Sequence, residues 1–224
     1  MAHLTRAFYE RDSREVAPEL LNKVLVHDDP EAGRLAVRIV EVEAYAGEED
    51  PGSHGYRGLT PRTATMFGPG GHLYVYFTYG MHWCANVVTG TEGVCSAVLL
   101  RAGEPLEGLE AMRARRPAAR RDRELCSGPA RLAQALGLTR EHDGADLVLG
   151  PIHLVDDGMP PPREPGNSVR VGLGPGRGDE HPWRWFVPGN EHVSRVRVGA
   201  PTDAPGRRRP PLGARSRVGS TDAR

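Results

Sequence analysis

The hydrophobic and polar residues of this chain alternate most regularly in the segment GRLAVRIVEVEAY, residues 33–45. Its β-branched residues alternate with polar ones, which predicts a β-strand. A repeat of two places four side chains on one face of that strand, namely Ile39, Glu41, Glu43 and Tyr45.

A second alternating segment, HLYVYFTYGMHWCAN at residues 72–86, contains three of the six tyrosines of the chain. The alternation predicts a strand with two faces. The side chains that face the core are Leu73, Val75 and Phe77, and those on the opposite face are Tyr74, Tyr76 and Thr78. The tyrosines either fill a core or form a surface on which a flat ligand stacks, and the pattern leaves both interpretations open.

The rest of the pattern predicts a single α+β domain over residues 1–199. Helices are expected within 1–26, with a cap at Asp12 or Ser13 and a first-turn position or a break at Pro18, and over 105–116 and 127–137, the last capped by Ser127 and ended by Gly137. Strands are expected over 93–105, 146–157 and 181–189, with a loop at 47–62 and a loop-rich region after residue 160. Residues 200–224 are poor in hydrophobic side chains and are expected to form a disordered tail rich in proline and arginine.

The chain has a formal net charge of zero, so its overall field does not indicate a nucleic-acid partner. The charges are nevertheless segregated, with five acidic residues in 41–50 and six arginines against one acid in 113–123. Every basic residue except Lys23 is an arginine. This bias reflects either the base composition of the genome or, for the 113–123 cluster, a contact with a polyanion.

The three cysteines, Cys84, Cys95 and Cys126, form no CxxC pair and are odd in number, which is typical of a reduced, cytoplasmic protein. The N-terminus has no basic-then-apolar leader pattern, and no apolar run is long enough to span a bilayer. No established metal-binding spacing or glycine-rich nucleotide loop is present, although three histidines and a cysteine leave a metal site to be considered, namely His54, His72, His82 and Cys84.

Glu43 is the first candidate for chemistry, because an unpaired carboxylate buried among apolar residues would cost several kcal/mol. The alternative is an edge strand whose Glu41 and Glu43 face water. Arg101, at the end of a predicted strand, is either a surface arginine or a neighbour that keeps Glu43 ionised, as a general base requires. Glu43 and Tyr45 at a strand end that opens into a loop form a common layout for a site.

Four long strings of the chain resemble the 3-methyladenine (alkyladenine) DNA glycosylase family: RIVEVEAY, SHGYRGLTPRTATMFGPGGHLYVYFTYGMHWCANVV, AVLLRAGEPLEGLEAMRARR and DRELCSGPARLAQALG. The resemblance runs in order from about residue 4 to residue 140 and is weaker over 151–198. It implies a curved, mixed or antiparallel sheet flanked by helices, no cofactor and no metal. The implied activity is hydrolytic excision of alkylated or deaminated purines from damaged double-stranded DNA by a monomer.

The resemblance also implies roles for single residues. Glu43 corresponds to the carboxylate that activates the attacking water, and Arg101 to an arginine that helps to hold this water. Three rings correspond to those that enclose the flipped base, namely Tyr45, His54 and Tyr76. Two further residues, Asn86 and Leu99, correspond to side chains that shape the pocket. Tyr79 corresponds to a tyrosine that wedges into the duplex. The segment 170–185 departs from the usual family pattern, which puts the closing edge of the pocket in question.

The chemistry needs residues of these types. A purine stacked in a duplex has to be flipped out, which costs a few kcal/mol, and an inserted ring such as Tyr79 offsets about 1–3 kcal/mol of that cost. A cationic alkylated base gains about 0.5–2 kcal/mol per contact with an aromatic face. Such contacts give only modest selectivity, so the weaker bond of the damaged nucleotide and the pocket shape must supply the rest.

A glycosylase that also cuts the strand through a Schiff base needs a lysine or a free N-terminal amine. Lys23, the only lysine, lies in a predicted helix away from the motifs, so we expect a monofunctional enzyme that leaves an intact abasic strand. Two other functions compete. One is a non-catalytic module that binds single-stranded nucleic acid on the tyrosines, and the other is a metal-dependent hydrolase using Glu43, His54, His82 and Cys84.

Overall fold

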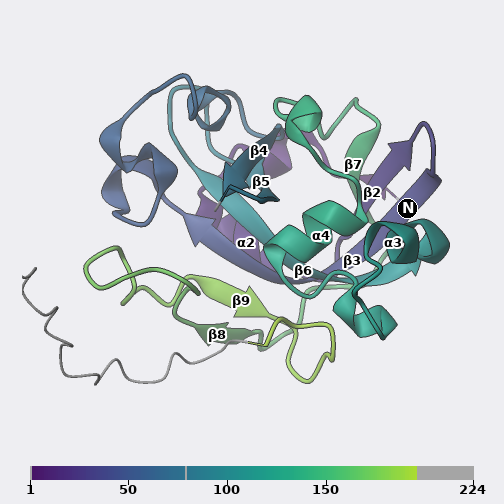
Figure 1. The fold of residues 1–224 in the computed structure, drawn as a ribbon. Coiled ribbons are helices and arrows are strands. Elements are labelled where there is room, and N and C mark those ends of the chain that lie inside the picture. Colours follow the sequence, from purple (N-terminus) through teal and green to yellow (C-terminus); the bar gives the residue numbers. More distant parts are fainter. Residues whose placement is uncertain (1, 79, 196–224) are drawn as a thin grey trace, which may run out of the picture.

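The structure, a computed structural model, describes residues 2–78 and 80–195. Its strands form one antiparallel sheet in the order β1-β7-β2-β3-β6-β5-β4, with β9 pairing to both β3 and β8 (Figure 1). The strands are β1 (Ala2–His3), β2 (Val24–Asp29), β3 (Gly33–Tyr45), β4 (Leu73–Thr78), β5 (His82–Val88), β6 (Ala97–Glu107), β7 (Ile152–Asp156), β8 (Gly166–Ser168) and β9 (Arg184–Phe186). The predicted α+β fold with a curved antiparallel sheet and flanking helices is therefore confirmed.

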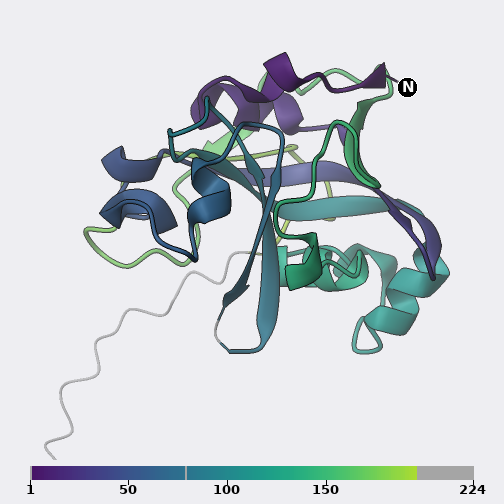
Figure 2. The same ribbon diagram turned by 90° about the horizontal axis from the view of Figure 1, so that it is seen from above.

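The helices are short: α1 (Arg6–Tyr9), α2 (Ser13–Leu20), α3 (Leu109–Arg115) and α4 (Pro129–Ala135). Short 3-10 turns occur at Gly47–Glu49, His54–Arg57, Ala64–Phe67, Asp122–Glu124 and Arg140–His142. Figure 2 shows α1 and α2 on one side of the long strands β3 and β6, and α3 and α4 on the other side. Apolar side chains from α2, α4 and the long strands, among them Leu20, Leu132 and Leu100, are buried together.

The structure corrects two local predictions. The expected N-terminal helical region ends at Leu20, and Val24–Asp29 form strand β2 instead, because these residues pair on both edges with β3 and β7. Phe77 is not in the core but 45 % exposed. It pairs with Trp83 near the end of the β4–β5 hairpin, and the two rings lie 4.8 Å apart.

Of the two predicted helix N-caps, the structure confirms one and corrects the other. Asp12 does cap α2, by accepting a hydrogen bond from the backbone N–H of Arg14, and Pro18 lies inside α2 rather than in its first turn. Ser127 does not cap α4, which begins after Gly128 without a side-chain cap. Instead, Ser127 forms a bridge to Ala102 of β6.

Strand β3 changes partners midway along its length. Its first half pairs with β2 and its second half with β9, while β6 lies along its other edge. The β3–β6 register shifts around Glu41, between the pairs Ile39–Gly103 and Val42–Leu100. Both carboxylates of interest, Glu41 and Glu43, thus lie where β3 has neighbours on both edges, and both are fully buried. The alternative of a water-facing edge strand is wrong.

Tyr79, the expected boundary at residue 199 and the expected tail lie outside the described residues. Among the described residues, no helix combines the length and the hydropathy that crossing a membrane requires.

Candidate active site

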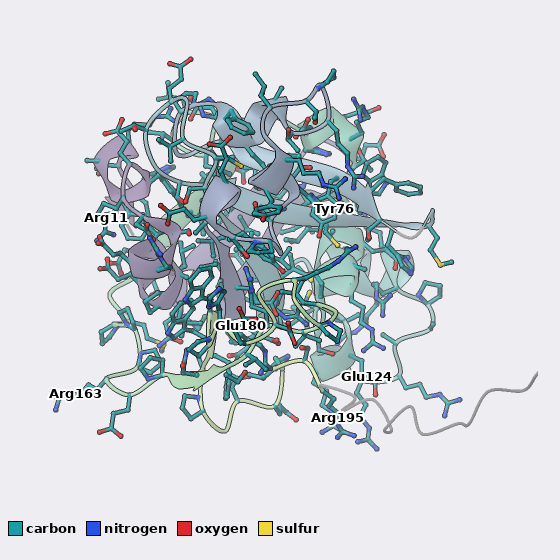
Figure 3. The ribbon with its side chains drawn as sticks, turned by 90° about the vertical axis from the view of Figure 1, so that its left-hand side faces the viewer. Arg11, Tyr76, Glu124, Arg163, Glu180 and Arg195 are labelled. Atoms are coloured by element: carbon teal, nitrogen blue, oxygen red, sulfur yellow. The ribbon has the colours of Figure 1, made fainter. Side chains whose placement is uncertain are left out.

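A pocket of about 430 Å³ opens between strands β3–β6, the first residues of α4, the loop around His54 and the segment 171–177. Six of the side chains predicted from the sequence line it: Tyr45, His54, Tyr76, Asn86, Leu99 and Arg101. Figure 3 views this side of the molecule, with Tyr76 above the C-terminal segment that carries Glu180. The segment whose sequence departs from the family pattern therefore forms one wall of the pocket.

The strand register explains why distant residues meet here. Tyr74 on β4 pairs with Asn86 on β5, Asn86 pairs with Leu99 on β6, and Leu99 pairs with Glu43 on β3. Paired residues lie side by side on the same face, so these four side chains form one row across the sheet. The Asn86 amide also donates a hydrogen bond to the backbone oxygen of Tyr74 (3.3 Å).

One wall of the pocket is aromatic. The rings of Tyr74 and Tyr76 stack with centroids 5.5 Å apart, and the His54 ring meets Tyr76 edge-on at 4.5 Å. Tyr74, whose role the sequence left open, is 1 % exposed, and its hydroxyl oxygen lies 3.2 Å from His54 Nδ1. Tyr74 therefore supports both His54 and Tyr76. Desolvation of the His54 ring, followed by the charge of Arg62, lowers the pKa of His54 to about 4. This wall therefore carries no charge at neutral pH.

The loop that brings His54 to the pocket is fixed by close packing. It starts at Gly47, which has φ of 62°, and a Cβ there would lie 1.9 Å from the backbone oxygen of Cys95. The Ser53 side chain then caps the turn His54–Arg57 by accepting a hydrogen bond from Gly55 N. A larger residue at position 47 would push this loop away from Cys95, two residues before β6.

Glu43 is held by three groups. Its Oε2 accepts a hydrogen bond from the Tyr45 hydroxyl (2.9 Å), and its Oε1 accepts one from Val171 N (2.7 Å) and lies 3.1 Å from Arg101 Nη1. Burial and then the charge of Glu43 raise the pKa of Tyr45 well above its usual value, so the hydroxyl keeps the proton it donates. Glu43 itself does not line the pocket, but Tyr45, Val171 and Arg101, which contact it, all do.

Arg101 is the cation that contacts Glu43. It is 6 % exposed and contacts both Glu43 and Glu41. Burial alone would lower the pKa of Arg101, but the charges of Glu43 and Glu41 outweigh burial and raise it, so the guanidinium stays protonated. The predicted proximity of Arg101 to Glu43 is present in the structure.

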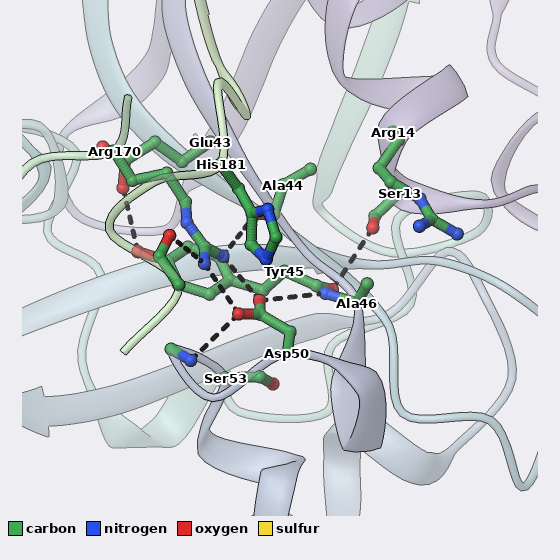
Figure 4. Close-up of polar contacts among 12 residues, drawn as sticks. Ser13, Arg14, Glu43, Ala44, Tyr45, Ala46, Asp50, Ser53, Arg170 and His181 are labelled. Atoms are coloured by element: carbon green, nitrogen blue, oxygen red, sulfur yellow. Dashed lines mark hydrogen bonds and ion pairs between the residues drawn. The ribbon is translucent and has the colours of Figure 1, made fainter. Parts of the chain in front are cut away.

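A buried ion pair that the sequence did not reveal joins the walls of the pocket (Figure 4). The Arg170 guanidinium forms two short hydrogen bonds with the Asp50 carboxylate, and neither side chain is exposed. Arg170 also donates to the backbone oxygen of Ala44 (2.9 Å), and its guanidinium lies over the rings of Tyr45 (4.6 Å) and Trp183 (5.1 Å). One arginine therefore connects the end of β3, the 47–58 loop and the C-terminal segment.

The arginine cluster 113–123 lies on and after α3 and is partly neutralised within the protein. Arg113 pairs with Asp122, Arg115 with Asp29 and Arg123 with Glu191, a set of three ion pairs. Arg120 and Arg121 are exposed and form no ion pair with the described residues. A polyanion contact would therefore depend on part of the cluster only.

Cys84 is buried beside the pocket, whereas His54 and His82 are exposed. Across residues 2–78 and 80–195, His, Cys, Asp and Glu form no group of three or more that could hold a metal ion. The donor arrangement thus gives no support to a metal-dependent hydrolase.

Comparison with known proteins agrees with this geometry. The family model described as "Methylpurine-DNA glycosylase (MPG)" matches residues 7–191. Similar proteins, each named "Putative 3-methyladenine DNA glycosylase", occur in Burkholderia cenocepacia (58 % identical over 191 residues, 84 % of this chain and 89 % of the relative), in Streptomyces avermitilis (51 % over 201 residues, 88 % and 93 %) and in Methanoculleus marisnigri (48 % over 195 residues, 86 % and 98 %). This chain therefore belongs to the methylpurine-DNA glycosylase family and is a DNA glycosylase, a hydrolase of N-glycosyl bonds that serves DNA repair.

Proposed function

We propose that this glycosylase removes alkylated or deaminated purines, such as 3-methyladenine, 7-methylguanine and hypoxanthine, from damaged double-stranded DNA. The observation that carries the proposal is the buried Glu43 carboxylate, paired with Arg101 directly behind a pocket walled by Tyr76 and His54. A pocket of about 430 Å³ has the size of small-molecule sites in proteins. It suits a single flipped base better than a stretch of nucleic acid.

The flipped base would lie among Tyr45, His54 and Tyr76. Because the lowered pKa of His54 keeps its ring neutral at pH 7, this wall carries no positive charge that would repel a cationic alkylated purine. Each aromatic face would stabilise such a base by about 0.5–2 kcal/mol. Asn86 and Leu99, side by side in the row across the sheet, would limit the shape of the purine edge that fits. Tyr79, proposed to fill the gap in the duplex, lies outside the described residues.

Glu43 would act on the sugar side of the base. Glycosidic cleavage passes through an oxocarbenium-like state, which a fixed negative charge stabilises. A carboxylate offers about four acceptor positions, and Tyr45, Val171 and Arg101 occupy three of those of Glu43, which leaves capacity for the attacking water. A purine alkylated at N3 or N7 leaves as a neutral base, so its excision requires no second carboxylate acting as a general acid. Hypoxanthine carries no such charge and would have to be protonated as it leaves.

The enzyme would be monofunctional. Lys23 is the only lysine of the chain, and its Nζ forms an ion pair with Asp156 on β7 at 2.6 Å. With 7 % exposure and a fixed partner, Lys23 is poorly placed to attack an abasic sugar. The product would be an intact strand with an abasic site.

We further propose a monomer that needs no cofactor and acts in the cytoplasm on the nucleoid. The free, buried state of Cys84, Cys95 and Cys126 fits a reducing compartment. One pocket and one inserted ring require a single copy of the chain.

The proposal is tested by measuring base release. The protein is incubated with dimethyl sulfate-treated duplex DNA and with duplexes that each carry one lesion, and free bases are separated by chromatography. Release of 3-methyladenine and 7-methylguanine with intact strands is expected, with and without EDTA. Binding to single strands without release would favour the non-catalytic module, and loss of release in EDTA would favour a metal-dependent hydrolase.

A further inference from the structure

A second buried carboxylate, Glu41, lies two residues before Glu43 on β3. Its Oε1 accepts hydrogen bonds from Arg101 Nε (2.7 Å), Arg184 Nε (2.7 Å) and Ser194 Oγ (2.8 Å), and its Oε2 accepts one from Ser194 N (2.6 Å). Burial would raise the pKa of Glu41, but the charges of Arg101 and Arg184 outweigh burial and lower it, so the side chain is ionised. The proposed reaction makes no use of this carboxylate.

Arg101 lies between the two carboxylates and divides its donors between them. Its Nε donates to Glu41, its Nη1 lies 3.1 Å from Glu43, and its Nη2 has no hydrogen-bond partner among the described residues. Arg101 also lines the pocket. A guanidinium released from Glu41 would be free to pair with Glu43 through both ends of its planar fork, as arginine does with single carboxylates. That pairing would use the donor that the present arrangement leaves open.

We infer that Glu41 is a positioning residue that orients the Arg101 guanidinium. By engaging Nε, Glu41 keeps Nη1 on Glu43 and leaves Nη2 available to the substrate or the attacking water. This inference rests on the proposed catalytic roles of Glu43 and Arg101. Arg184 from β9 balances the charge of the buried group, and Ser194 ties Glu41 to the C-terminal segment.

The alternative is that Glu41 only stabilises the fold as the partner of Arg184. The double variant Glu41→Gln with Arg184→Gln separates the two roles, because it removes one negative and one positive charge together and leaves no uncompensated buried ion. We expect this variant to fold and to bind lesion-containing duplex. Its single-turnover rate of base release should fall about 100-fold, since small misplacements of catalytic groups have effects of this size.

The pH profile of the rate supplies a second readout. The double variant removes one negative and one positive charge near Glu43, whose direct effects on its ionisation oppose each other, so a shift of the profile reports mainly on Arg101. The charged and titratable groups around Glu43 are Arg101 from β6, Tyr45 and Glu41 on β3, Tyr76 on β4 and Arg184 on β9. Once Arg101 pairs with Glu43 alone, the carboxylate is easier to ionise, so the acid limb of the profile should move to lower pH. Ser194→Ala, which keeps the Arg101–Glu41 contact, is the control and should retain the original acid limb.

Several results would overturn the inference. If the double variant released the base at the original rate, Glu41 would not orient Arg101. The same would follow if the double variant were slower but the acid limb of its pH–rate profile did not move. Failure of both the double variant and the single Glu41→Gln variant to fold, judged by circular dichroism, would make Glu41 a residue of stability alone. Glu43→Gln, measured in parallel, distinguishes this outcome from failure of the proposed function, because an active Glu43→Gln enzyme would refute the catalytic assignment itself.

Discussion

Replacing Asp50 by asparagine should destabilise the protein strongly and loosen the pocket. Asp50 forms two hydrogen bonds with Arg170, and it also accepts hydrogen bonds from Gly52 N (2.9 Å) and Ala46 N (3.2 Å). The substitution leaves a buried guanidinium without its counter-ion, which costs about 3–5 kcal/mol. For a chain of this length, each kcal/mol lowers Tm by about 2–4 °C, so we expect a decrease of roughly 6–20 °C.

The assay is thermal unfolding followed by circular dichroism, with Asp122→Asn as the matched control. Asp122 also pairs with an arginine, Arg113, but their side chains are 47 % and 52 % exposed, and exposed pairs contribute about 0–1 kcal/mol. The apolar pair Asp50→Leu with Arg170→Met should recover much of the lost stability, because no unpaired charge remains. A Tm decrease for Asp50→Asn no larger than that for Asp122→Asn would refute the claim that this ion pair joins the walls of the pocket.

Three other predictions follow from the same contacts. Tyr45→Phe keeps the ring but removes the donor to Glu43, so the acid limb of the rate profile should move to higher pH; an unmoved limb would contradict the contact. The pKa of His54 in the folded protein should be about 4, below its value of 6.5 in the unfolded chain. Between pH 6.5 and 4 the unfolded chain binds more protons, so the free energy of unfolding should fall as the pH drops through this range. An NMR titration of His54 with a pKa near 6.5 would disprove this. Lys23→Arg should release bases at the original rate, and borohydride should trap no covalent adduct with the original protein; a trapped adduct would refute monofunctionality.

The sequence predicted the long elements well because their patterns are local. The strand over 33–45 and the helix ended by Gly137 follow from alternation and from turn residues. The single strand predicted over 72–86 is only partly right, because the structure forms two paired strands there, β4 and β5. The first residues of β2, 24–26, were mistaken for helix because their apolar side chains continue a helical spacing, and only pairing with β3 and β7 makes them a strand. Pattern alone does not reveal such long-range pairing.

In the candidate site, too, some features follow from local sequence patterns and others depend on long-range contacts. The faces of Glu43 and Tyr76 follow from strand periodicity, and the family resemblance supplied Asn86 and Leu99. The Asp50–Arg170 pair joins residues 120 positions apart, and the contact of Glu41 with Ser194 spans 153 positions. No local signal marks either contact, and the acids of 41–50 were visible only as a cluster of charge. Phe77 was misplaced because alternation predicts which face of the strand a side chain lies on, but not whether other residues pack against that face at each position.

The most direct test of the central claim is the single-turnover rate of Glu43→Gln on a duplex with one lesion, measured beside its binding to the same duplex. Glutamine keeps the shape of the side chain but removes the charge and the basicity that the reaction requires. We expect the rate to fall about 10²–10⁴-fold while binding to the damaged duplex is retained. Release of the base by Glu43→Gln at a rate near that of the original enzyme would contradict the assignment of Glu43 as the catalytic carboxylate.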